Sequence, residues 1–266
     1  MPQYQDQIGN TINLTTLPKR IVSLVPSQTE LLFDLGLDRE IVGVTKFCIH
    51  PKIKIKSTAK IGGTKSLSIN KIKALIPDLI IANKEENEQD QIETLQKIYP
   101  VWTSDISKLA DAFDMITKVG QITGKVMEAQ MMVQRINQSF SLLNLNTLNL
   151  RVAYFIWRKP YMVVGRGTFI NDILQKCGFE NVIKLDRYQE IYAGNLVEAK
   201  PDVVLLSTEP YPFKDRHIEE FKTLLPNAII KIVDGEIFSW YGSRLLHAPA
   251  YLNKLITDLT NIHHEK

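Results

Sequence analysis

The residues best suited to bind a ligand gather where three predicted strands of the second half end. They are FIWRKPY at 155–161, EPYPF at 209–213 and GEIFSWYGSR at 235–244. Ligands of open α/β sheets bind at the carboxyl ends of the strands. Large rings with a few charges suit a flat or bulky organic ligand. The alternative interpretation is that these rings pack the loops or the two halves of the chain.

Motifs of enzyme catalysis are missing from the sequence. It contains no G-x-S-x-G, H-E-x-x-H, G-x-x-x-x-G-K-[ST] or C-x-x-C,. Gly165-Arg166-Gly167 begins a dinucleotide-like G-x-G, but Ile170 stands where the third glycine belongs. We therefore expect a turn there, either joining two strands or opening a helix at Thr168.

The two cysteines do not indicate a metal site or a disulfide framework. Cys48 and His50 could be two metal ligands, but two ligands are too few for a zinc site. A buried cysteine beside a loop histidine is the favoured interpretation, and no metal site is expected. Cys177, within ILQKCGF, is expected to be a small core residue,. Two cysteines cannot build a disulfide framework.

Composition excludes several classes of protein. The 266 residues are 44% hydrophobic and 23% charged, which is typical of a globular protein,. A formal charge of +3 is too weak to indicate a nucleic-acid partner,. No apolar run reaches the length of a membrane span, and no signal peptide is visible. A periplasmic or lipid-anchored location is expected if a leader was trimmed, and a cytoplasmic one if the sequence is complete.

The elements that would position these residues alternate between strand and helix. Strands are expected at 20–25, 41–45, 79–82 and 100–103, with helices at 29–36, 68–76 and 87–98 between them. This alternation predicts a parallel α/β sheet. From Ser107 to about Asn146 the periodicity is helical without a strand, and Gly124 divides it into two helices,.

After this helical stretch the first pattern returns. LVEAKPDVVLL at 196–206 repeats IKALIPDLIIA at 72–82, and INDILQKCGFENVIKL at 170–185 resembles TELLFDLGLDREIVGV at 29–44. The sequence therefore predicts an α/β half over 1–123, a linking helix over 124–147 and a second α/β half over 148–266. Duplication of this kind is typical of two facing lobes.

These residues carry a family resemblance that covers the chain from about Ile8 to Leu259. RIVSLVPSQTELLFDLGLDREIVGVT at 20–45, IGGTKSLSINKIKALIPDLIIA at 61–82 and the lone helix resemble the cobalamin and iron–siderophore binding proteins of bacterial ABC importers. VPSQTELLF and FSWYGSRLL at 238–246 favour the cobalamin-binding branch. The resemblance implies the class III periplasmic-binding fold, with two Rossmann-like lobes of parallel sheet joined by one backbone helix.

The resemblance also implies a ligand in the cleft between the lobes. The first lobe would supply Ser27, Gln28, Thr29, Phe47, His50, Thr64 and Lys65. The second lobe would supply Trp157, Tyr161, Arg166, Glu236, Phe238 and Trp240.

The sequence departs from the family at the positions that dock on the permease. The resemblance implies one acidic residue per lobe, near the start of the helix before the Pro-Asp strand. Asn70 occupies the first of these positions, and Gly194 or Asn195 the second. The nearby acids are displaced, at Glu85, Glu86, Glu190 and Glu198.

The leading hypothesis is a monomeric, non-catalytic binding protein of an ABC importer, without a prosthetic group. Its ligand would be a cobalamin-like corrinoid, then haem or a ferric siderophore. A second hypothesis is a cytoplasmic carrier or sensor that uses the same cleft without a transporter. A third is an enzyme acting on a chelate or phosphorylated metabolite, for which Glu236, His50 and Arg166 are the candidate groups.

Overall fold

The computed structural model describes residues 2–145 and 148–265, which divide into two compact units. The first unit comprises the chain up to Ile106, Ala110–Ile136 and Trp240–Arg244. The second comprises Ser107–Leu109, Asn137–Ser239 and the chain from Leu245. Each unit is described by itself below. Within the described ranges, no helix combines the length and apolarity needed to cross a membrane.

The first unit is built on a five-stranded parallel sheet in the order β5-β4-β3-β8-β9. Its strands are β3 (Ile21–Ser23), β4 (Ile41–Val44), β5 (Ala59–Lys60), β8 (Leu79–Asn83) and β9 (Val101–Ser104). The central strands β3 and β8 are buried along their whole length, as a sheet covered on both faces requires,. The expected parallel α/β sheet is confirmed.

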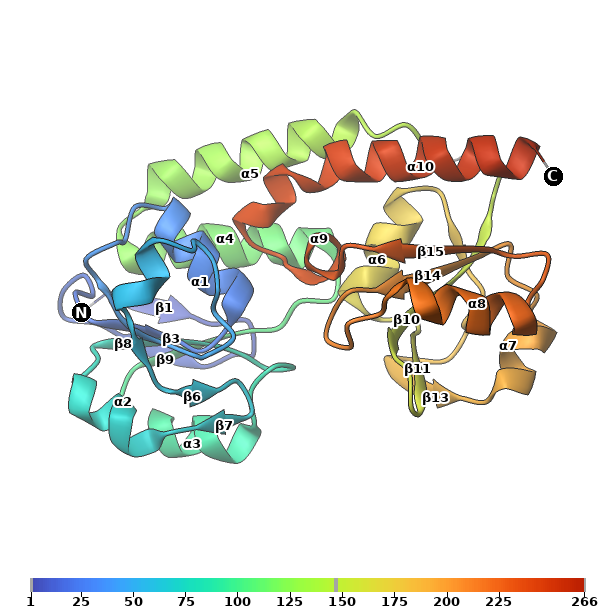
Figure 1. The fold of residues 1–266 in the computed structure, drawn as a ribbon. Helices are drawn as coiled ribbons and strands as arrows, with labels where there is room; N and C mark the ends of the chain where they lie inside the picture. Colours follow the sequence, from blue (N-terminus) through green and yellow to red (C-terminus); the bar gives the residue numbers. More distant parts are fainter. Residues whose placement is uncertain (1, 146–147, 266) are drawn as a thin grey trace. The chain divides into compact units, whose positions relative to one another are not determined.

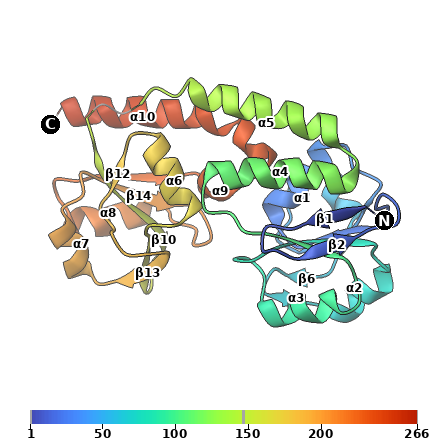
Figure 2. The same cartoon turned by 180° about the vertical axis from the view of Figure 1, so that it is seen from behind.

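Helices cover both faces of this sheet. Figures 1 and 2 show α1 and α4 on one face and α2 and α3 on the other. Their bounds are α1 (Pro26–Asp34), α2 (Ile69–Leu75), α3 (Gln89–Gln96) and α4 (Leu109–Thr123). The unit also contains the short helix η1 (Lys54–Ser57) and two hairpins, β1 (Gln3–Gln5) with β2 (Thr11–Asn13) and β6 (Gly62–Gly63) with β7 (Ser66–Leu67).

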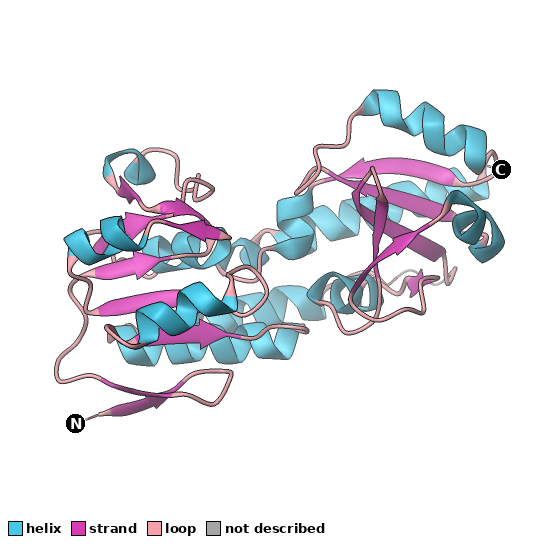
Figure 3. Cartoon of the chain, turned by 90° about the horizontal axis from the view of Figure 1, so that it is seen from below, coloured by secondary structure: helices cyan, strands magenta, loops and turns pink. Residues whose placement is uncertain are grey.

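The sheet of the second unit is mixed. Its order is β13-β11-β10-β14-β15, with β12 beside β10. Figure 3 shows the strands in magenta and the helices in cyan. The strands are β10 (Arg151–Trp157), β11 (Tyr161–Val164), β12 (Glu180–Asn181), β13 (Tyr188–Ile191), β14 (Val203–Ser207) and β15 (Ile229–Val233). β11 runs antiparallel to both β10 and β13, which corrects the expectation of a wholly parallel sheet. Only three residues join β10 to β11, and so short a connection allows an antiparallel pair alone.

The helices of the second unit follow its strands. They are α6 (Phe169–Lys176), α7 (Ala193–Ala199), α8 (Asp215–Leu224), α9 (Gly235–Ser239) and α10 (Ala248–His264), with η2 (Ser243–Leu246) beginning in the loop that belongs to the first unit. Thr168 caps α6, its side-chain oxygen accepting from the Asn171 amide at 3.2 Å. The G-x-G segment is therefore the opening of a helix, as expected.

The helix predicted over 124–147 is shorter than expected. α5 covers Val126–Ser141, and Gly124, with φ of +73°, separates it from α4. The helix ends in i→i−3 hydrogen bonds at Leu142 and Leu143. The asparagine-rich run that follows has low helix propensity. Residues 146 and 147, also predicted to be helical, lie outside the described residues.

The internal repeat is visible in the short helices that precede β8 and β14. α2 and α7 each have seven residues and end at a residue in the left-handed region, Ile76 and Lys200, both with φ of 45°. A Pro-Asp pair and a fully buried five-residue strand follow in both cases. The same helix ending and Pro-Asp turn therefore precede an equivalent strand in each unit.

Candidate functional site

Two polar atoms at the start of α1 are buried and have no hydrogen-bond partner among the described residues. The helix begins at Pro26, after two residues that follow β3, and Ser27 and Gln28 lie in its first turn. The Gln28 amide donates to the Ser104 hydroxyl at the end of β9. Its Oε1 and the Ser27 Oγ have no hydrogen-bond partner in the described chain. Since buried polar atoms are normally hydrogen-bonded, the chain's own bonding is incomplete here.

Thr29, the third predicted residue of this helix, belongs to the core. Its side chain is fully buried, with Oγ1 2.7 Å from Ser23 Oγ and 2.8 Å from the Val25 carbonyl oxygen. Cys48 Sγ lies 3.1 Å from this hydroxyl and 3.1 Å from that of Thr45. Burial raises the pKa of the Cys48 thiol above its usual value. This is the buried cysteine that the sequence favours.

His50 and Trp240 are the two predicted residues that the structure brings into ring contact. Their ring centroids lie 5.5 Å apart in an edge-to-face arrangement. The Arg244 guanidinium lies over the Trp240 ring, 4.8 Å from its centroid. The resemblance places Trp240 in the second lobe, whereas the structure places Trp240–Arg244 in the first unit. Because Trp240 is 7% exposed, most of its ring is engaged in packing.

An ion pair fixes this loop on α1. Arg244 donates from Nη2 and Nε to the two carboxylate oxygens of Glu30, at 2.6 and 3.0 Å, and both side chains are 15% exposed. Burial raises the pKa of Glu30, and the hydrogen bonds and charge of Arg244 oppose that rise. The paired geometry compensates each charge for much of its lost hydration.

The close approach of the loop requires a glycine at position 242. A Cβ built on Gly242 would lie 2.6 Å from the Ser27 carbonyl oxygen, a backbone atom that cannot easily move. Beside it, the Ser243 Oγ is buried and unpartnered in the described chain, like the Ser27 Oγ. The Tyr241 hydroxyl donates to Glu86 Oε1 at 3.0 Å. The loop and the α1 start therefore form one polar, partly unsatisfied cluster.

The remaining predicted residues of the first unit lie on two neighbouring loops. Phe47 is 52% exposed, with the Lys46 ammonium 5.0 Å from its ring centroid. A Cβ on Gly63 would lie 3.3 Å from the Phe47 ring, so the β6–β7 turn that carries Thr64 and Lys65 is adjacent. Thr64 is half-buried, and the Lys65 ammonium lies 3.4 Å from Glu88.

In the second unit, an exposed tryptophan at the end of β10 contacts a half-buried tyrosine in the loop after β14. Trp157 ends β10 and is 39% exposed. Tyr211, in the loop after β14, meets it edge-on with centroids 5.6 Å apart. The Trp157 indole nitrogen donates to the Lys159 carbonyl at 3.2 Å, which fixes the ring. Trp157 thus presents a held aromatic face where a sheet ligand would bind.

Tyr161 belongs to a polar network beside that pair. Its hydroxyl donates to Glu220 Oε1 at 2.5 Å, and Arg158 donates to Oε2 from Nη2 at 2.6 Å and Nε at 2.8 Å. Burial and the hydrogen bond to Glu220 raise the pKa of Tyr161 to about 12. Burial alone would raise the pKa of Glu220, but the bonds from Arg158 and Tyr161 lower it overall. The Tyr161 hydroxyl is therefore kept protonated and fixed.

The last three predicted residues have separate surroundings. Phe238 is fully buried and packs on Tyr154, with ring centroids 5.0 Å apart. Glu236 lies in the first turn of α9 and lines a cavity of about 390 Å³, together with Thr208, Glu209 and Asp234. Arg166 lies 3.3 Å from Asp186 in an exposed ion pair and lines another cavity, of about 380 Å³.

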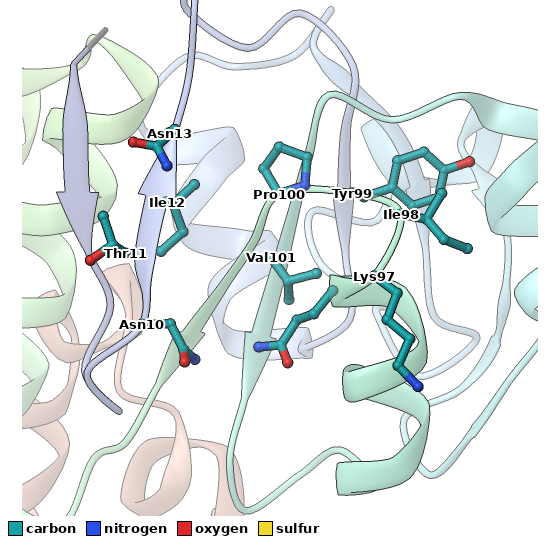
Figure 4. A pocket seen from close by; sticks show the side chains of 10 residues that line it. Asn10, Thr11, Ile12, Asn13, Lys97, Ile98, Tyr99, Pro100 and Val101 are labelled. Carbon is teal, nitrogen blue, oxygen red and sulfur yellow. The ribbon is translucent and has the colours of Figure 1, made fainter.

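Two further cavities of the first unit contain none of the predicted residues. One, of about 490 Å³, lies between β2 and the α3–β9 connection, with Ile12, Tyr99 and Val101 in its walls (Figure 4). The other, of about 610 Å³, is lined mainly by polar side chains, including Asn83 and Thr103. No group of three or more His, Cys, Asp or Glu side chains could hold a metal ion within the part of the chain described.

Glu30 and Glu220 are residues of these clusters that the sequence did not single out. Both lie on helices, where an acidic residue is an ordinary surface choice. Nothing in the local pattern indicates that Arg244, 214 positions later, pairs with Glu30. Tyr211 lies in the aromatic run at 209–213, but the family resemblance does not place it among the ligand contacts.

Comparison with known proteins gives one family and one fold. A vitamin B12-binding protein of Pectobacterium carotovorum is 23% identical over 252 residues, covering 92% of this chain and 90% of that protein. A possible iron-binding, periplasmic solute-binding protein of Staphylococcus epidermidis has a similar fold, with a TM-score of 0.76, 23% identity and 92% and 99% of the two chains covered. The periplasmic vitamin B12-binding protein of Vibrio cholerae also has a similar fold, with a TM-score of 0.74 and 18% identity. The match covers 91% of this chain and 98% of that chain.

The family model described as periplasmic binding protein matches residues 21–226. This range contains all the strands of the first sheet and most of those of the second. The family and the relatives named above are binding proteins and not enzymes. Because the match spans well over half of the sequence, the chain belongs to the periplasmic binding protein family.

Proposed function

We propose that this protein binds a metal-bearing macrocycle or chelate without catalysis, as the substrate-binding component of an ABC importer. A cobalamin-like corrinoid is favoured over haem or a ferric siderophore. The similarity to vitamin B12-binding proteins supports this order. The observation that carries the proposal is the exposed, hydrogen-bonded ring of Trp157 at the end of β10.

Specific residues of each unit would contact the ligand. In the second unit, the faces of Trp157 and Tyr161 would bind the apolar rim of a macrocycle, and Arg166 would bind a carboxylate or amide at its edge. In the first unit, the unpartnered oxygens of Ser27 and Gln28 would bind polar groups. Phe47, with half its ring exposed, would add apolar contact. His50, Thr64, Lys65 and Glu236 stay candidates, while Thr29, Phe238 and Trp240 would act mainly by packing behind the contact surface.

A carrier or sensor without a transporter is the second candidate, because the docking positions carry no charge. Asn70 is exposed in the first turn of α2. Gly194 and Asn195 lie in the first turn of α7, and the Asn195 side-chain oxygen accepts from the Tyr192 amide at 3.1 Å. Neither position offers the carboxylate expected for permease arginines.

The proposal is tested by titrating the protein with cyanocobalamin, cobinamide, haem and a ferric siderophore. Absorption spectra report binding, and the melting temperature reports stabilisation. A ligand at about a hundred times its Kd should add about 2.7 kcal/mol to the free energy of unfolding. Trp157→Ala should weaken binding, while Tyr192→Ala, which removes an 85% exposed ring of the same unit, should not. The proposal would be contradicted if none of the four ligands changed the absorption spectrum or the melting temperature.

A further inference from the structure

The stretch between Glu40 and Asp78 is unusually basic. It contains no Asp or Glu, although the whole chain has 29, and it contains eight lysines. They are Lys46, Lys52, Lys54, Lys56, Lys60, Lys65, Lys71 and Lys73. The net charge of +3 for the whole chain hides this local excess. All of these residues belong to the first unit.

Within this stretch, the basic loop (residues 49–56) holds an apolar side chain out in solvent. Ile53 is 85% exposed and Ile49 is 48% exposed. The loop is nevertheless anchored, because Cys48 and Ile55 are buried at 1% and 6% exposure. The Ile55 amide also donates to the Pro51 carbonyl at 3.1 Å. Core packing therefore explains Ile55 but not Ile53.

The lysines of the basic loop differ in their pairing. Lys54 lies 2.6 Å from the Asp38 carboxylate. Lys52 and Lys56, on either side of Ile53, are exposed and make no ion pair with any described residue. Two uncompensated ammonium groups thus flank one exposed isoleucine.

We propose that the basic loop docks this protein on a membrane surface that contains anionic lipid. A branched apolar side chain can enter the boundary between headgroups and acyl chains, while lysine ammoniums stay at the level of the phosphates. Anionic headgroups supply the negative charge to pair with Lys52 and Lys56, which have no acidic partner among the described residues. A loop whose exposed apolar side chains are Ile49 and Ile53 suits this boundary better than it suits a protein face, where binding needs a larger complementary area,. This inference does not depend on the ligand of the proposed function.

The test is sedimentation of the purified full chain with vesicles of phosphatidylcholine, alone or mixed equally with phosphatidylglycerol. We expect binding to the mixed vesicles, weakened by salt, and little binding to the neutral ones. Each lysine near an anionic surface contributes about a fivefold increase in partition, so Lys52→Gln with Lys56→Gln should weaken binding about 30-fold. Ile53→Ser should weaken it about tenfold.

The matched controls remove exposed lysines and an exposed apolar side chain that lie outside the basic loop. Lys97→Gln with Lys176→Gln removes two exposed lysines, and Met127→Ser removes an apolar side chain that is 66% exposed. Melting curves verify that each variant is folded. Equal binding to both vesicle types, or equal losses in the controls, would overturn the proposal. Salt-sensitive binding to a reconstituted permease through Lys52 and Lys56, without binding to protein-free vesicles, would assign the loop to a protein partner instead.

Discussion

Asp78 Oδ1 accepts a hydrogen bond from the backbone amide of Arg20 at 2.8 Å, and the Arg20 guanidinium donates one to the Leu75 carbonyl at the end of α2. The second Asp78 oxygen accepts from the Lys19 amide, also at 2.8 Å. Strand β3 is thereby tied at its start to the connection between α2 and β8. Asp202 accepts from the Arg151 amide at 2.8 Å, so the second unit has the same lock.

Asp78→Ala should lower the free energy of unfolding by about 1–3 kcal/mol, because two backbone amides lose a charged acceptor. Chemical denaturation measures this change. Asp38→Ala is the control, since it breaks an exposed pair with Lys54 and should cost about 0–1 kcal/mol,. Equal effects of the two substitutions would show that the lock contributes no more than a surface ion pair.

Trp157→Ala should weaken ligand binding by about 2–3 kcal/mol, or roughly 30- to 150-fold in Kd. The ring is 39% exposed, so its loss should lower the melting temperature less than the loss of Trp240, which is 7% exposed. Trp240→Ala should do the reverse: its ring is packed against His50 and Arg244, and its loss should cost about 3–5 kcal/mol of stability,. Titration and melting of both variants separate these effects. A folded Trp157→Ala protein with unchanged Kd would remove Trp157 from the site.

His217 should make stability depend on pH. The residue is 2% exposed, and burial, with the charges of Arg216 and Arg158, lowers its pKa below the usual value. Because the folded pKa is the lower one, this contribution is fully present above about pH 6.5. It is lost as the pH falls through the folded pKa.

NMR titration of the His217 ring should therefore give a midpoint below 6.5. Urea unfolding should show a loss of stability on acidification of at most about 1.4 kcal/mol per pH unit from this group. His217→Asn should remove this component, because asparagine can still accept from the Lys214 amide that bonds Nδ1 at 2.8 Å. His264→Asn, at an exposed position, should retain it. A midpoint at or above 6.5 would contradict the expected shift.

Docking on a related permease should be weak in the wild-type protein, because positions 70 and 194–195 lack charge. Asn70→Glu with Gly194→Glu should strengthen it, since charge-assisted hydrogen bonds are stronger than neutral ones. Gly194 can take a side chain, as a Cβ there meets no atom within 4 Å. The Gln pair at both positions is the uncharged control. Binding to permease liposomes is the measurement.

Tight, salt-sensitive binding by the wild type would contradict that expectation. Its loss in Glu190→Ala or Glu198→Ala would show that a displaced acid performs the docking. Both of these acids are exposed.

The sequence predicted the repeated α/β halves because strand, helix and Pro-Asp signals are local. It did not predict that β11 runs antiparallel to β10 and β13, because the direction of β11 depends on the length of the connection after β10 and not on residue type. The site residues were also harder to predict, because their exposure depends on tertiary packing and not on local sequence. Phe238 and Trp157 look alike in the sequence, and only tertiary packing buries one and exposes the other.

The first unit is not one continuous piece of chain, since Trp240–Arg244 belongs to it. A fragment ending at residue 136 would contain Glu30 without Arg244, so it would lack both this ion pair and the packing of Trp240. Such a fragment should be less stable than its hydrophobic core suggests. A peptide that carries WYGSR should restore part of that stability when added in trans. Biosynthesis has a corresponding order, because the amino-terminal unit can be completed only after most of the second has left the ribosome.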